Sequence, residues 1–523
     1  MTTETRFRVF ADLYKDSVAL MQIGATLRKR PGIVEASCIM ATPANLAQLQ
    51  HAGLTVDVDV HPSDLLIVVR GDQPACADAI DAAHTLLQGA QAAARELSGA
   101  FSLPVTSIAA GVEQAPDANL ALISVPGDYA AAEAMKALSL GLHVMLFSDN
   151  VGIDEERAIK NHAAARGLMV MGPDCGTAIV NGIPLGFANV VRRGDIGLVA
   201  ASGTGLQEVT CRIHNLGAGV SQAIGTGGRD LRDEIGGLTM LQALRALAAD
   251  DETAVIVLIS KPPSPAIASR ILDLAAASGK PTVVHFLGAA PDAVRRAGLH
   301  AAESLAQTAD IAVALAKGDD ACHMSSPFVP GDHERLLDGL APSQRCVRGL
   351  FSGGTFCYEA QLTFLRCRLP SRSNVPVHGA LPLDGSSSDH VFIDMGDDEY
   401  TRGRPHPMID PTLRNAAIRA AADDPALAVL LFDVVLGYGA HPSPAGELAD
   451  ALRDAQHAAA LDRRKLIPIG HVCGTEGDPQ DRTAQLRTLA SAGVIVADSN
   501  LHAASIAAQL AMRLAERNPS RTR

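Results

Sequence analysis

The chain has 523 residues, of which 47% are hydrophobic and 19% are charged, so it is long enough to form several cores. Its net charge of -13, without a basic run, argues against a nucleic-acid partner, and no apolar stretch approaches the ~18 residues of a membrane span. The nine Cys residues are scattered without a CxxC pair and the amino terminus lacks an apolar signal core, so we expect a cytoplasmic protein with reduced thiols and no metal site.

Short apolar runs alternate with Ala/Leu-rich helical stretches along the whole chain. Several runs, such as 65–69 and 254–259, are continuously apolar, which is typical of strands buried on both faces. The alternation predicts an α/β protein with several doubly wound parallel-sheet domains joined by right-handed crossovers. In chain order, strands are expected at residues 7–14, 34–40, 65–69, 121–125, 144–147, 169–171, 196–200, 220–224, 254–259, 282–286, 346–350, 391–394, 429–434, 466–471 and 494–497.

Composition divides the chain into four blocks. An amino-terminal α/β domain is expected over residues 1–100, where a long Ala/Gln-rich helix ends it. Further βαβ blocks are expected over 101–195, 196–316 and 343–515. The Pro/Ser/Asp-rich stretch 317–342 separates the last two blocks and is typical of a linker.

The blocks 196–316 and 343–515 share five features in the same order. Each begins with a strand, a Ser-Gly turn and a helix that contains Glu208 or Glu359. A Gly/acid turn, a strand after Asp-Asp, a Pro-containing turn and a strand after a Lys then follow in both blocks. This order predicts an internal duplication, and the alternative is that unrelated flavodoxin-like units look alike.

Two Gly/hydroxyl turns occupy equivalent places in these blocks, after a strand and at the start of a helix. Free backbone N–H groups at such a helix end favour an anion such as phosphate or carboxylate. The alternative is a tight turn with a Ser/Thr cap. We predict that both turns converge on one anionic ligand. Their residues are Ser202, Gly203, Thr204 and Gly205, and Ser352, Gly353, Gly354 and Thr355.

Two arginines lie in loops that follow strands, where open parallel sheets bind ligands. Arg229 stands in the Gly-rich turn 225–230, and Arg404 stands in the Pro-stiffened loop 403–411. Both suit a carboxylate or phosphoryl oxygen. The alternatives are a local pair with Asp230 and a stiff connector.

Two histidines are candidate catalytic groups. His406 belongs to the loop 403–411, and His441 belongs to the Gly-rich loop 437–442 after the most apolar strand. His441 is alternatively a surface residue. No Walker A, early GxGxxG, GxSxG or HExxH motif is present, so nothing favours a nucleotide kinase, a dinucleotide dehydrogenase, a serine hydrolase or a zinc enzyme.

Several long strings resemble known sequences. ALISVPGDYAAAEAMKAL (121–138), LMVMGPDCGTA (168–178), GLVAASGTGLQEV (197–209) and GTGGRD (225–230) resemble the α subunit of succinyl-CoA synthetase. VRGLFSGGTFCYEA (347–360), FIDMGDDEY (392–400) and LLFDVVLGYGAHPSPAGEL (430–448) resemble the carboxy-terminal domain of its β subunit. With GRPHPMIDPTLRN as well, the chain is identified as a member of the FdrA family over nearly its whole length.

The resemblance implies a CoA-binding, Rossmann-like domain over 101–195 and two flavodoxin-like ligase domains over 196–316 and 343–515. It makes CoA a possible cofactor, although GPDC departs from the family's GPNC. The residues implied in CoA binding are Val125, Pro126, Gly172, Pro173, Asp174 and Cys175. The ATP-grasp domain of the β subunit has no counterpart, and the phosphohistidine loop reads VRRAGLHAAESL with an inserted Leu, which makes His300 the candidate there.

The family implies a subunit of a carbamoyltransferase that converts oxalurate and phosphate into oxamate and carbamoyl phosphate, in allantoin-derived nitrogen catabolism. Other subunits of a complex and self-association into a homo-oligomer are then expected, with phosphate and a small molecule as ligands. The alternatives are a CoA-dependent acyl-CoA synthetase that uses an ATP-grasp partner chain, and a non-catalytic binding subunit of a metabolic complex.

Overall fold

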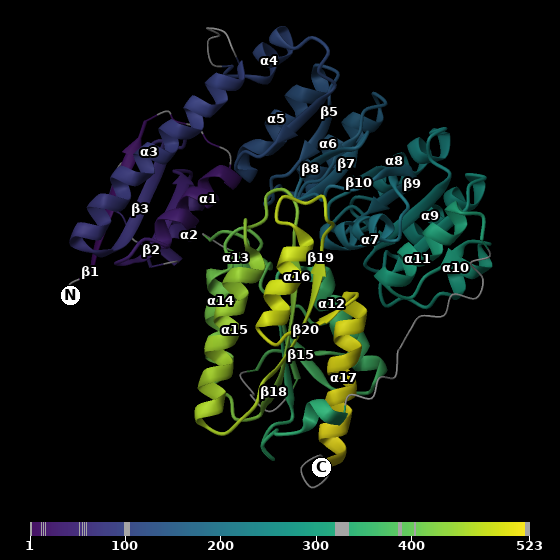
Figure 1. Ribbon diagram of the computed structural model, residues 1–523. Coiled ribbons are helices and arrows are strands. Elements are labelled where there is room, and N and C mark those ends of the chain that lie inside the picture. The colour runs from purple at the N-terminus through teal and green to yellow at the C-terminus, as the bar shows by residue number, and fades with distance from the viewer. Residues whose placement is uncertain are drawn as a thin grey trace.

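The computed structural model describes residues 3–98, 105–319, 334–384, 390–401 and 404–517, apart from single positions between residues 12 and 16 and between 52 and 59. Figure 1 shows the amino-terminal domain as a separate lobe, with the two larger blocks beside it and beneath it. Most of the predicted linker, residues 320–333, lies outside the described residues.

The amino-terminal domain is a three-stranded sheet with helices. Its elements are β1 (Thr3–Phe10), α1 (Ser17–Arg28), β2 (Ile33–Met40), α2 (Pro43–His51), β3 (Leu65–Asp72) and α3 (Gln73–Ser98). The strand order is β1-β3-β2 and both pairings are antiparallel, so the predicted parallel arrangement is wrong for this domain. The reason is that β3 lies between the first two strands and runs opposite to both. An alternation of strands and helices carries no information about that direction.

A second, parallel sheet follows. Its elements are α4 (Ile108–Gln114), β4 (Leu120–Ile123), α5 (Gly127–Ser139), β5 (His143–Leu146), α6 (Ile153–Ala164) and β6 (Val170–Met171). The order is β4-β5-β6, and the carboxyl ends of all three strands lie at the same edge.

The third sheet has seven strands. Its elements are β7 (Thr177–Val180), β8 (Ile183–Gly186), β9 (Arg193–Ala200), α7 (Gly203–Asn215), β10 (Val220–Gly225), α8 (Leu238–Ala249), β11 (Val255–Ser260), α9 (Pro265–Ala277), β12 (Thr282–Phe286), α10 (Asp292–Arg296), β13 (His300–Ala301) and α11 (Leu305–Ala316). β9 to β13 are parallel, whereas β7 and β8 form a hairpin whose β7 pairs antiparallel with β10. The predicted boundary at residue 195 therefore falls inside a sheet, because the hairpin belongs to this sheet and not to the preceding one.

The fourth sheet also has seven strands. Its elements are η1 (Glu334–Leu337), β14 (Cys346–Phe351), α12 (Gly354–Arg366), β15 (Ser371–Ser373), β16 (Leu381–Pro382), β17 (His390–Asp394), α13 (Asp398–Thr401), α14 (Thr412–Ala421), β18 (Leu427–Val435), α15 (Pro444–Leu461), β19 (Ile467–Cys473), α16 (Arg482–Ser491), β20 (Ile495–Ala497) and α17 (Asn500–Arg517). All of its pairings are parallel, as predicted.

The two large sheets have the same topology, which supports the predicted duplication. The order β13-β12-β11-β9-β10 of one corresponds strand for strand to β20-β19-β18-β14-β17 of the other. Equivalent positions even keep their side chains: His285 of β12 contacts the carbonyl oxygen of Ala302 through Nδ1 at 3.0 Å, and His471 of β19 contacts that of Ala497 at 3.3 Å. The duplication therefore extends to internal contacts.

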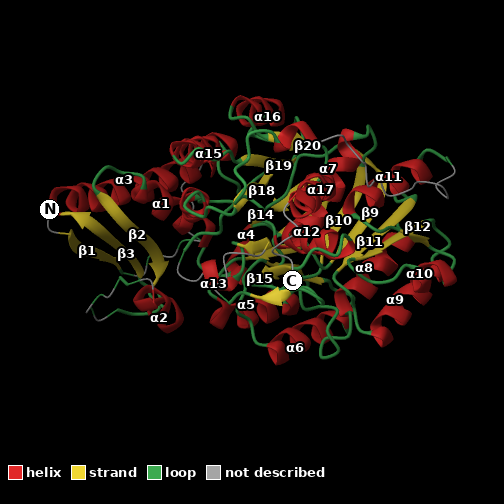
Figure 2. Ribbon diagram, turned by 90° about the horizontal axis from the view of Figure 1, so that it is seen from below, coloured by secondary structure: helices red, strands yellow, loops and turns green. Residues whose placement is uncertain are grey.

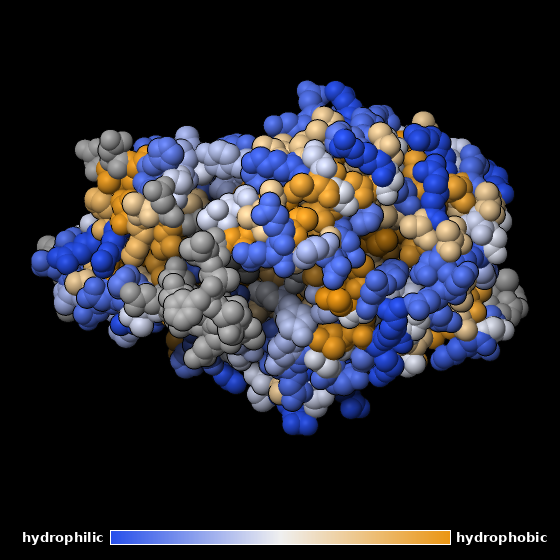
Figure 3. Space-filling view, turned by 90° about the horizontal axis from the view of Figure 1, so that it is seen from above, coloured by the Kyte–Doolittle hydropathy of each residue, from blue (hydrophilic) through white to orange (hydrophobic). Residues whose placement is uncertain are grey.

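One apolar core joins the two duplicated halves. It includes Leu206 and Ile213 of α7, Phe356 and Phe364 of α12, and residues of α11 and α17. Figure 2 shows these helices between the two sheets, with strands on both sides. In Figure 3 hydrophobic residues gather toward the middle of the upper face and on the amino-terminal lobe, and hydrophilic residues line the rim. Among the described helices, none is long and apolar enough to cross a membrane.

Candidate functional site

The two predicted Gly/hydroxyl turns lie together, at the N-termini of α7 and α12. The hydroxyl oxygens of Ser202 and Thr355 are 2.6 Å apart and form a hydrogen bond between the two halves. Ser202 also caps α7, because its Oγ accepts a hydrogen bond from the backbone N–H of Gly205 at 3.1 Å. We call residues 202–205 and 352–355 the paired helix ends.

Several backbone donors of the paired helix ends have no acceptor among the described residues. They are the N–H groups of Gly203 and Thr204 in α7 and of Gly354 and Thr355 in α12. The first turn of a helix leaves such groups unpaired, and the helix dipole adds positive potential there. Gly203 is exposed and Gly354 is half-buried, so an anion can approach from solvent. The geometry is that of an anion-binding site.

The second half satisfies part of its own helix end with a buried ion pair. The carboxylate of Asp433, at the end of β18, accepts hydrogen bonds from the backbone N–H groups of Ser352 at 2.7 Å and Gly353 at 2.8 Å. Arg414 of α14 donates to the same carboxylate at 3.1 Å and to the Ser352 hydroxyl at 2.9 Å. Asp433 and Arg414 were missed in the sequence analysis, although an acid within the apolar run 428–435 was a signal.

Among the described residues, the α7 end of the first half has no such internal carboxylate. Strand register shows which residue takes the place of Asp433 in the first half. Ala200 of β9 pairs with Ile259 of β11, and its repeat equivalent, Leu350 of β14, pairs with Phe432 of β18. The next residue along each partner strand is Ser260 in the first half and Asp433 in the second, so these two residues are equivalent. Ser260 is completely buried, and among the described residues nothing forms a hydrogen bond with its Oγ. The amide donors of α7 are therefore left for an external anion.

Two titratable side chains lie beside the end of α12. A Cβ placed on Gly396 would be 2.6 Å from Nε2 of His406 and 3.2 Å from Oδ1 of Asp394. Burial raises the pKa of Asp394 to about 7, although its carboxylate accepts from the N–H of Gly396 at 2.9 Å. Asp394 also adjoins the helix itself, since a Cβ on Gly354 would be 2.5 Å from its Oδ2. A carboxyl with such a pKa can both take up and release a proton near neutral pH.

His406 is held as a neutral donor. Its Nδ1 accepts a hydrogen bond from the backbone N–H of Met408 at 3.2 Å, so in the neutral ring the proton is on Nε2, which points to the Gly396 turn. Burial, and to a smaller degree Arg414, lowers the pKa of His406 to about 4. The ring of Phe187 lies 6.0 Å from the imidazole and covers it.

Cations also lie near this site. Lys261 follows β11, is exposed and stands 5.5 Å above the ring of Tyr358, and its charge acts on Asp394. Arg404 precedes His406 by two residues, and its side chain forms no hydrogen bond or ion pair with any described residue.

The residues implied in CoA binding lie at the carboxyl ends of β4, β5 and β6. The Ser148 hydroxyl, at the end of β5, donates to the carbonyl oxygen of Val125 at 2.5 Å, and the N–H of Asp174 donates to that of Ser148 at 3.0 Å. The loops 125–127 and 172–175 are thus brought together, with Pro126 half-buried and Pro173 buried.

Cys175 and Asp174 of these loops differ in accessibility. The thiol of Cys175 is buried and donates to the carbonyl oxygens of Thr177 and Gly225 at 3.5 Å each, and burial raises its pKa to about 12. Its side chain is therefore a packing group. Asp174 is exposed, but desolvation of its carboxyl by the surrounding loops, followed by the charge of Asp149, raises its pKa to about 6.

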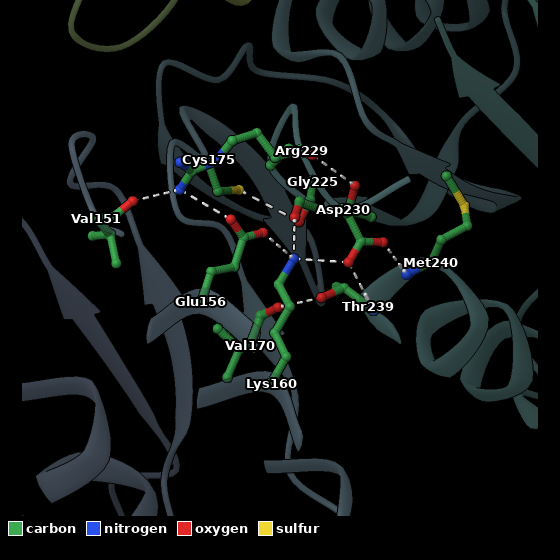
Figure 4. Close-up of polar contacts among 12 residues, drawn as sticks. Val151, Glu156, Lys160, Val170, Cys175, Gly225, Arg229, Asp230, Thr239 and Met240 are labelled. Carbon is green, nitrogen blue, oxygen red and sulfur yellow. Dashed lines mark hydrogen bonds and ion pairs between the residues drawn. The ribbon is translucent and has the colours of Figure 1, made fainter. Parts of the chain in front are cut away.

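Arg229 is engaged in a buried charge network, which Figure 4 shows. Its guanidinium lies 3.0 Å from Glu156 of α6 and donates to the carbonyl oxygen of Val151 at 2.8 Å. Lys160, one turn further along α6, lies 2.9 Å from Glu156 and 2.7 Å from Asp230, and all three side chains are at most 1% exposed. The network fixes the 225–230 turn to α6, so Arg229 contacts a helix some 70 residues earlier in the chain and not Asp230, as the alternative of a local pair would require.

The other two predicted histidines are not at the paired helix ends. His300 lies on the edge strand β13, which β12 and β11 separate from β9. His441 faces the amino-terminal domain: its Nε2 is 2.8 Å from Nζ of Lys29. Burial, followed by the charge of Lys29, lowers the pKa of His441.

A pocket of about 180 Å³ lies along α7, toward the end opposite Ser202. A buried pair joins the halves there, with Nε2 of His471 2.7 Å from Oε2 of Glu208. Burial opposes the charge of the imidazole, but the Glu208 carboxylate outweighs it and raises the pKa of His471. Glu359, the repeat partner of Glu208, accepts instead from the N–H of Leu305 at 3.1 Å. The two glutamates therefore link the halves reciprocally.

Family profiles match three parts of the chain, and the CoA-binding profile lies mainly after the block 101–195 for which a CoA-binding domain is predicted. A profile described as "CoA-ligase" matches residues 350–510, one described as "CoA binding domain" matches 191–288, and one described as "AllF, heavy metal-associated domain" matches 1–100. The CoA-binding match includes α7 with the amides of the exposed Gly203 and the half-buried Thr204, and helix N-terminal amides of this kind suit phosphate groups. The described residues of the amino-terminal domain do not fit a metal: no cluster of three His, Cys, Asp or Glu side chains occurs among them.

Solved structures similar to this chain include the apo form of the dinucleotide-forming acetyl-coenzyme A synthetase 1 of Ca. Korarchaeum cryptofilum, at 15% identity and a TM-score of 0.32 over 76% of this chain and 84% of that one. ATP citrate lyase from Methanothrix soehngenii, in complex with citrate and coenzyme A, is another, at 13% identity and a TM-score of 0.36 over 80% and 86%.

Two curated relatives define the family. Succinate–CoA ligase [ADP-forming] subunit alpha 2 of Archaeoglobus fulgidus is 30% identical over 149 residues, 28% of this chain, and the match spans only half of that subunit. The uncharacterized protein YahF of Escherichia coli K12 is 41% identical over 502 residues, 94% of this chain and 96% of YahF. The chain therefore belongs to the FdrA family of succinyl-CoA synthetase-like proteins, with a CoA-ligase domain and a CoA-binding domain.

Proposed function

We propose that the chain transfers an acyl group between phosphate and CoA, as in the acyl-CoA ligase alternative considered above. The observation that carries the proposal is the hydrogen bond between Ser202 and Thr355, which places two helix N-termini with unpaired amides at one point. The CoA-ligase and CoA-binding profiles on either side of this contact support it.

The reaction needs a place for phosphate and a group that moves one proton. The amides of Gly203, Thr204 and Gly354 hold the phosphate oxygens and the charge that develops on the acyl oxygen. The bond that forms joins a phosphate oxygen to the acyl carbon, and the bond that breaks joins that carbon to the leaving sulfur. The proton of the phosphate passes to the sulfur through Asp394, whose pKa of about 7 suits both transfers.

His406 and the nearby cations orient the acyl compound. The neutral imidazole of His406 offers an Nε2–H to a carbonyl oxygen of the substrate. Arg404 and Lys261 suit a second carboxylate on the same molecule. Arg229 contributes less to this step, because its guanidinium already pairs with Glu156.

A narrower form of the proposal is oxamate carbamoyltransferase activity, which the FdrA resemblance implies. There the acyl compound is oxalurate, the leaving group is the amide nitrogen of oxamate, and the product is carbamoyl phosphate. Arg404, which has no side-chain partner among the described residues, favours a substrate with a free carboxylate, such as oxalurate. Since several relatives are named as subunits, we propose that the chain acts with partner chains, and assays should include size-exclusion analysis.

A pair of substitutions at Gly203 tests phosphate binding. Gly203→Pro removes one N–H donor at the first position of α7, where Pro is tolerated and where the extended backbone of Ser202 permits it. Gly203→Ala keeps the donor and is the matched control. A hydrogen bond to a charged group contributes about 1.5–3 kcal/mol, so calorimetry with inorganic phosphate should show affinity reduced roughly 10- to 100-fold for the Pro variant alone. Equal affinities of the two variants would contradict the proposal.

A substitution at Ser260 tests whether the α7 amides bind phosphate, by placing a competing carboxylate of the protein beside them. Ser260→Asp gives the first half the internal carboxylate that Asp433 gives the second, so it should occupy the α7 amides and abolish phosphate binding. Ser260→Ala should leave binding intact. Thermal-shift titrations with CoA, phosphate and oxamate then separate the two forms of the proposal, since only the first needs CoA. Unchanged phosphate binding by the Asp variant would exclude α7 as the anion site.

A further inference from the structure

The loop that carries His406 is attached to the amino-terminal domain. Nη1 of Arg28, the last residue of α1, lies 2.5 Å from Oδ2 of Asp410, four residues after His406. The Asp410 side chain is 1% exposed and that of Arg28 is 13% exposed, so the contact is a buried ion pair between distant parts of the chain. Figure 1 shows α1 next to α13 and α14, the helices that flank this loop.

Asp410 transmits the position of Arg28 to His406. The backbone N–H of Asp410 donates to the carbonyl oxygen of His406 at 3.0 Å, which closes the loop into a turn. Its carboxylate also accepts from the N–H of Thr412 at 3.0 Å and from the Thr412 hydroxyl at 2.5 Å, at the start of α14. A single carboxylate thus joins the turn, the following helix and the amino-terminal domain.

A second contact lies beside the first. Nζ of Lys29 is 2.8 Å from Oε1 of Glu447 in α15 and 2.8 Å from Nε2 of His441. The N–H of His441 donates to the carbonyl oxygen of Met408, within the His406 turn, at 2.7 Å. Both cations at the end of α1 therefore act on the same loop.

Arg28 is itself oriented by its own domain. Its Nη2 donates to the carbonyl oxygen of Ala36 at 3.0 Å, and its Nε lies 3.3 Å from Glu35. The guanidinium is consequently directed at Asp410 by β2, rather than being a flexible surface group.

We infer that the amino-terminal domain is a positioning element of the candidate site: Arg28 holds Asp410 and thereby keeps His406 in place against the Gly396 turn. The inference rests on the proposed function for its importance, since His406 belongs to the same site, but its structural content does not depend on phosphate binding. Arg28 touches no reacting group and acts through Asp410.

The acid–base state of His406 reports this role. His406 is half-buried; the charge of Arg414 in α14 acts on its ring, and Asp394 at the end of β17 lies at the same Gly396 turn. Without Arg28, Asp410 is a buried carboxylate that has lost its cation, so it moves to water and takes the turn with it. His406 then becomes hydrated, and its pKa rises from about 4 toward 6.5.

The test is an NMR titration of the full chain labelled with ¹³C at the histidine Cε1 atoms, between pH 5.0 and 7.5. A His406→Gln variant assigns the signal. In the unaltered chain and in Arg30→Ala, the His406 signal should stay at its neutral position, because the exposed Arg30 side chain, two residues away, forms no hydrogen bond or ion pair with a described residue. In Arg28→Ala it should titrate within this range, and in Arg28→Lys, which keeps the charge, it should move much less.

The Asp410→Asn variant guards against a general folding effect. It removes the charge of the buried acid while its oxygen can still accept from Thr412, so with Arg28→Ala it should restore the neutral His406 signal. A flat His406 titration in folded Arg28→Ala overturns the inference, as does a shift of the same size in Arg30→Ala. Calorimetry with phosphate is a separate readout: absence of binding contradicts the proposed function and leaves this outcome interpretable.

Discussion

Replacement of Asp433 by Asn is the most direct test of how the candidate site is built. The Asp433 carboxylate is fully buried and accepts from the backbone N–H groups of Ser352 and Gly353 with different oxygens. Asn has only one oxygen, so one of the two amides faces an NH₂ group. Arg414, which is 2% exposed, keeps its charge but loses its carboxylate partner.

The expected loss of stability follows from these contacts. Removing one partner of a buried ion pair lowers the free energy of unfolding by about 3–5 kcal/mol, because the remaining charge stays buried without an opposite charge beside it. Since 1.4 kcal/mol is a factor of ten, local opening around Asp433 should become roughly 10²- to 10³-fold more frequent. The double variant Asp433→Leu with Arg414→Met removes both charges and should recover part of this loss.

Hydrogen exchange read by mass spectrometry measures this locally, which matters in a chain with several cores. Peptides from 346–356 and 427–435 should exchange faster in Asp433→Asn, whereas peptides from 65–72, in the amino-terminal sheet, should not change. If exchange in β14 and β18 is unaltered while Asp433→Asn is folded, the buried pair does not hold the α12 end, and the reasoning about the paired helix ends is refuted.

Three further predictions follow from other buried charges. Lys160→Met leaves two buried carboxylates without their shared cation and should destabilise the packing of α6 on the 225–240 region by about 3–5 kcal/mol, measured by exchange of peptides from 153–164. Burial raises the pKa of Asp394 to about 7, so ionisation of this carboxyl destabilises the fold as pH rises from about 4 to 7. The Asp394→Asn variant should therefore gain stability relative to the unaltered chain over that interval, by at most about 4 kcal/mol. Melting curves at pH 5 and 8 measure this difference. Because Glu208 raises the pKa of His471, their ion pair stabilises the fold below the ordinary His pKa of about 6.5, and this contribution is lost as pH rises through the higher pKa of the folded state. The Glu208→Gln variant should make stability less dependent on pH, which urea midpoints from pH 5.5 to 8.5 measure.

Much of the architecture could be predicted from the sequence, because it depends on local patterns. Continuous apolar runs such as 254–259 identify doubly buried strands, and the repeated order of turns identifies the duplication, which the equivalent strand orders of the two large sheets support. Strand direction is not a local property. The antiparallel sheet of the amino-terminal domain and the antiparallel pairing of β7 with β10 were therefore not predictable from alternating strands and helices.

The candidate site was predictable in its backbone and not in its side-chain partners. Ser202 and Ser352 stand in turns whose composition already favours a helix end that binds an anion, and the structure joins those turns. Arg229 illustrates the opposite case. Its neighbour Asp230 suggested a local pair, yet its partner is Glu156, because the fold brings α6 against the 225–230 turn. Such contacts depend on tertiary packing, which a single sequence does not reveal.

The difference between the two halves explains how a duplicated fold makes one binding site. At the end of α12 a fixed internal anion, Asp433, neutralises two amides and, with Arg414, immobilises the turn. At the end of α7 the equivalent position is Ser260, which is uncharged, so the amides of Gly203 and Thr204 keep their positive potential. If both ends carried a carboxylate, two negative charges would meet at the Ser202–Thr355 contact and repel a third anion. One rigid, neutralised end and one open, positive end are the arrangement in which the paired helices can hold an anion between them.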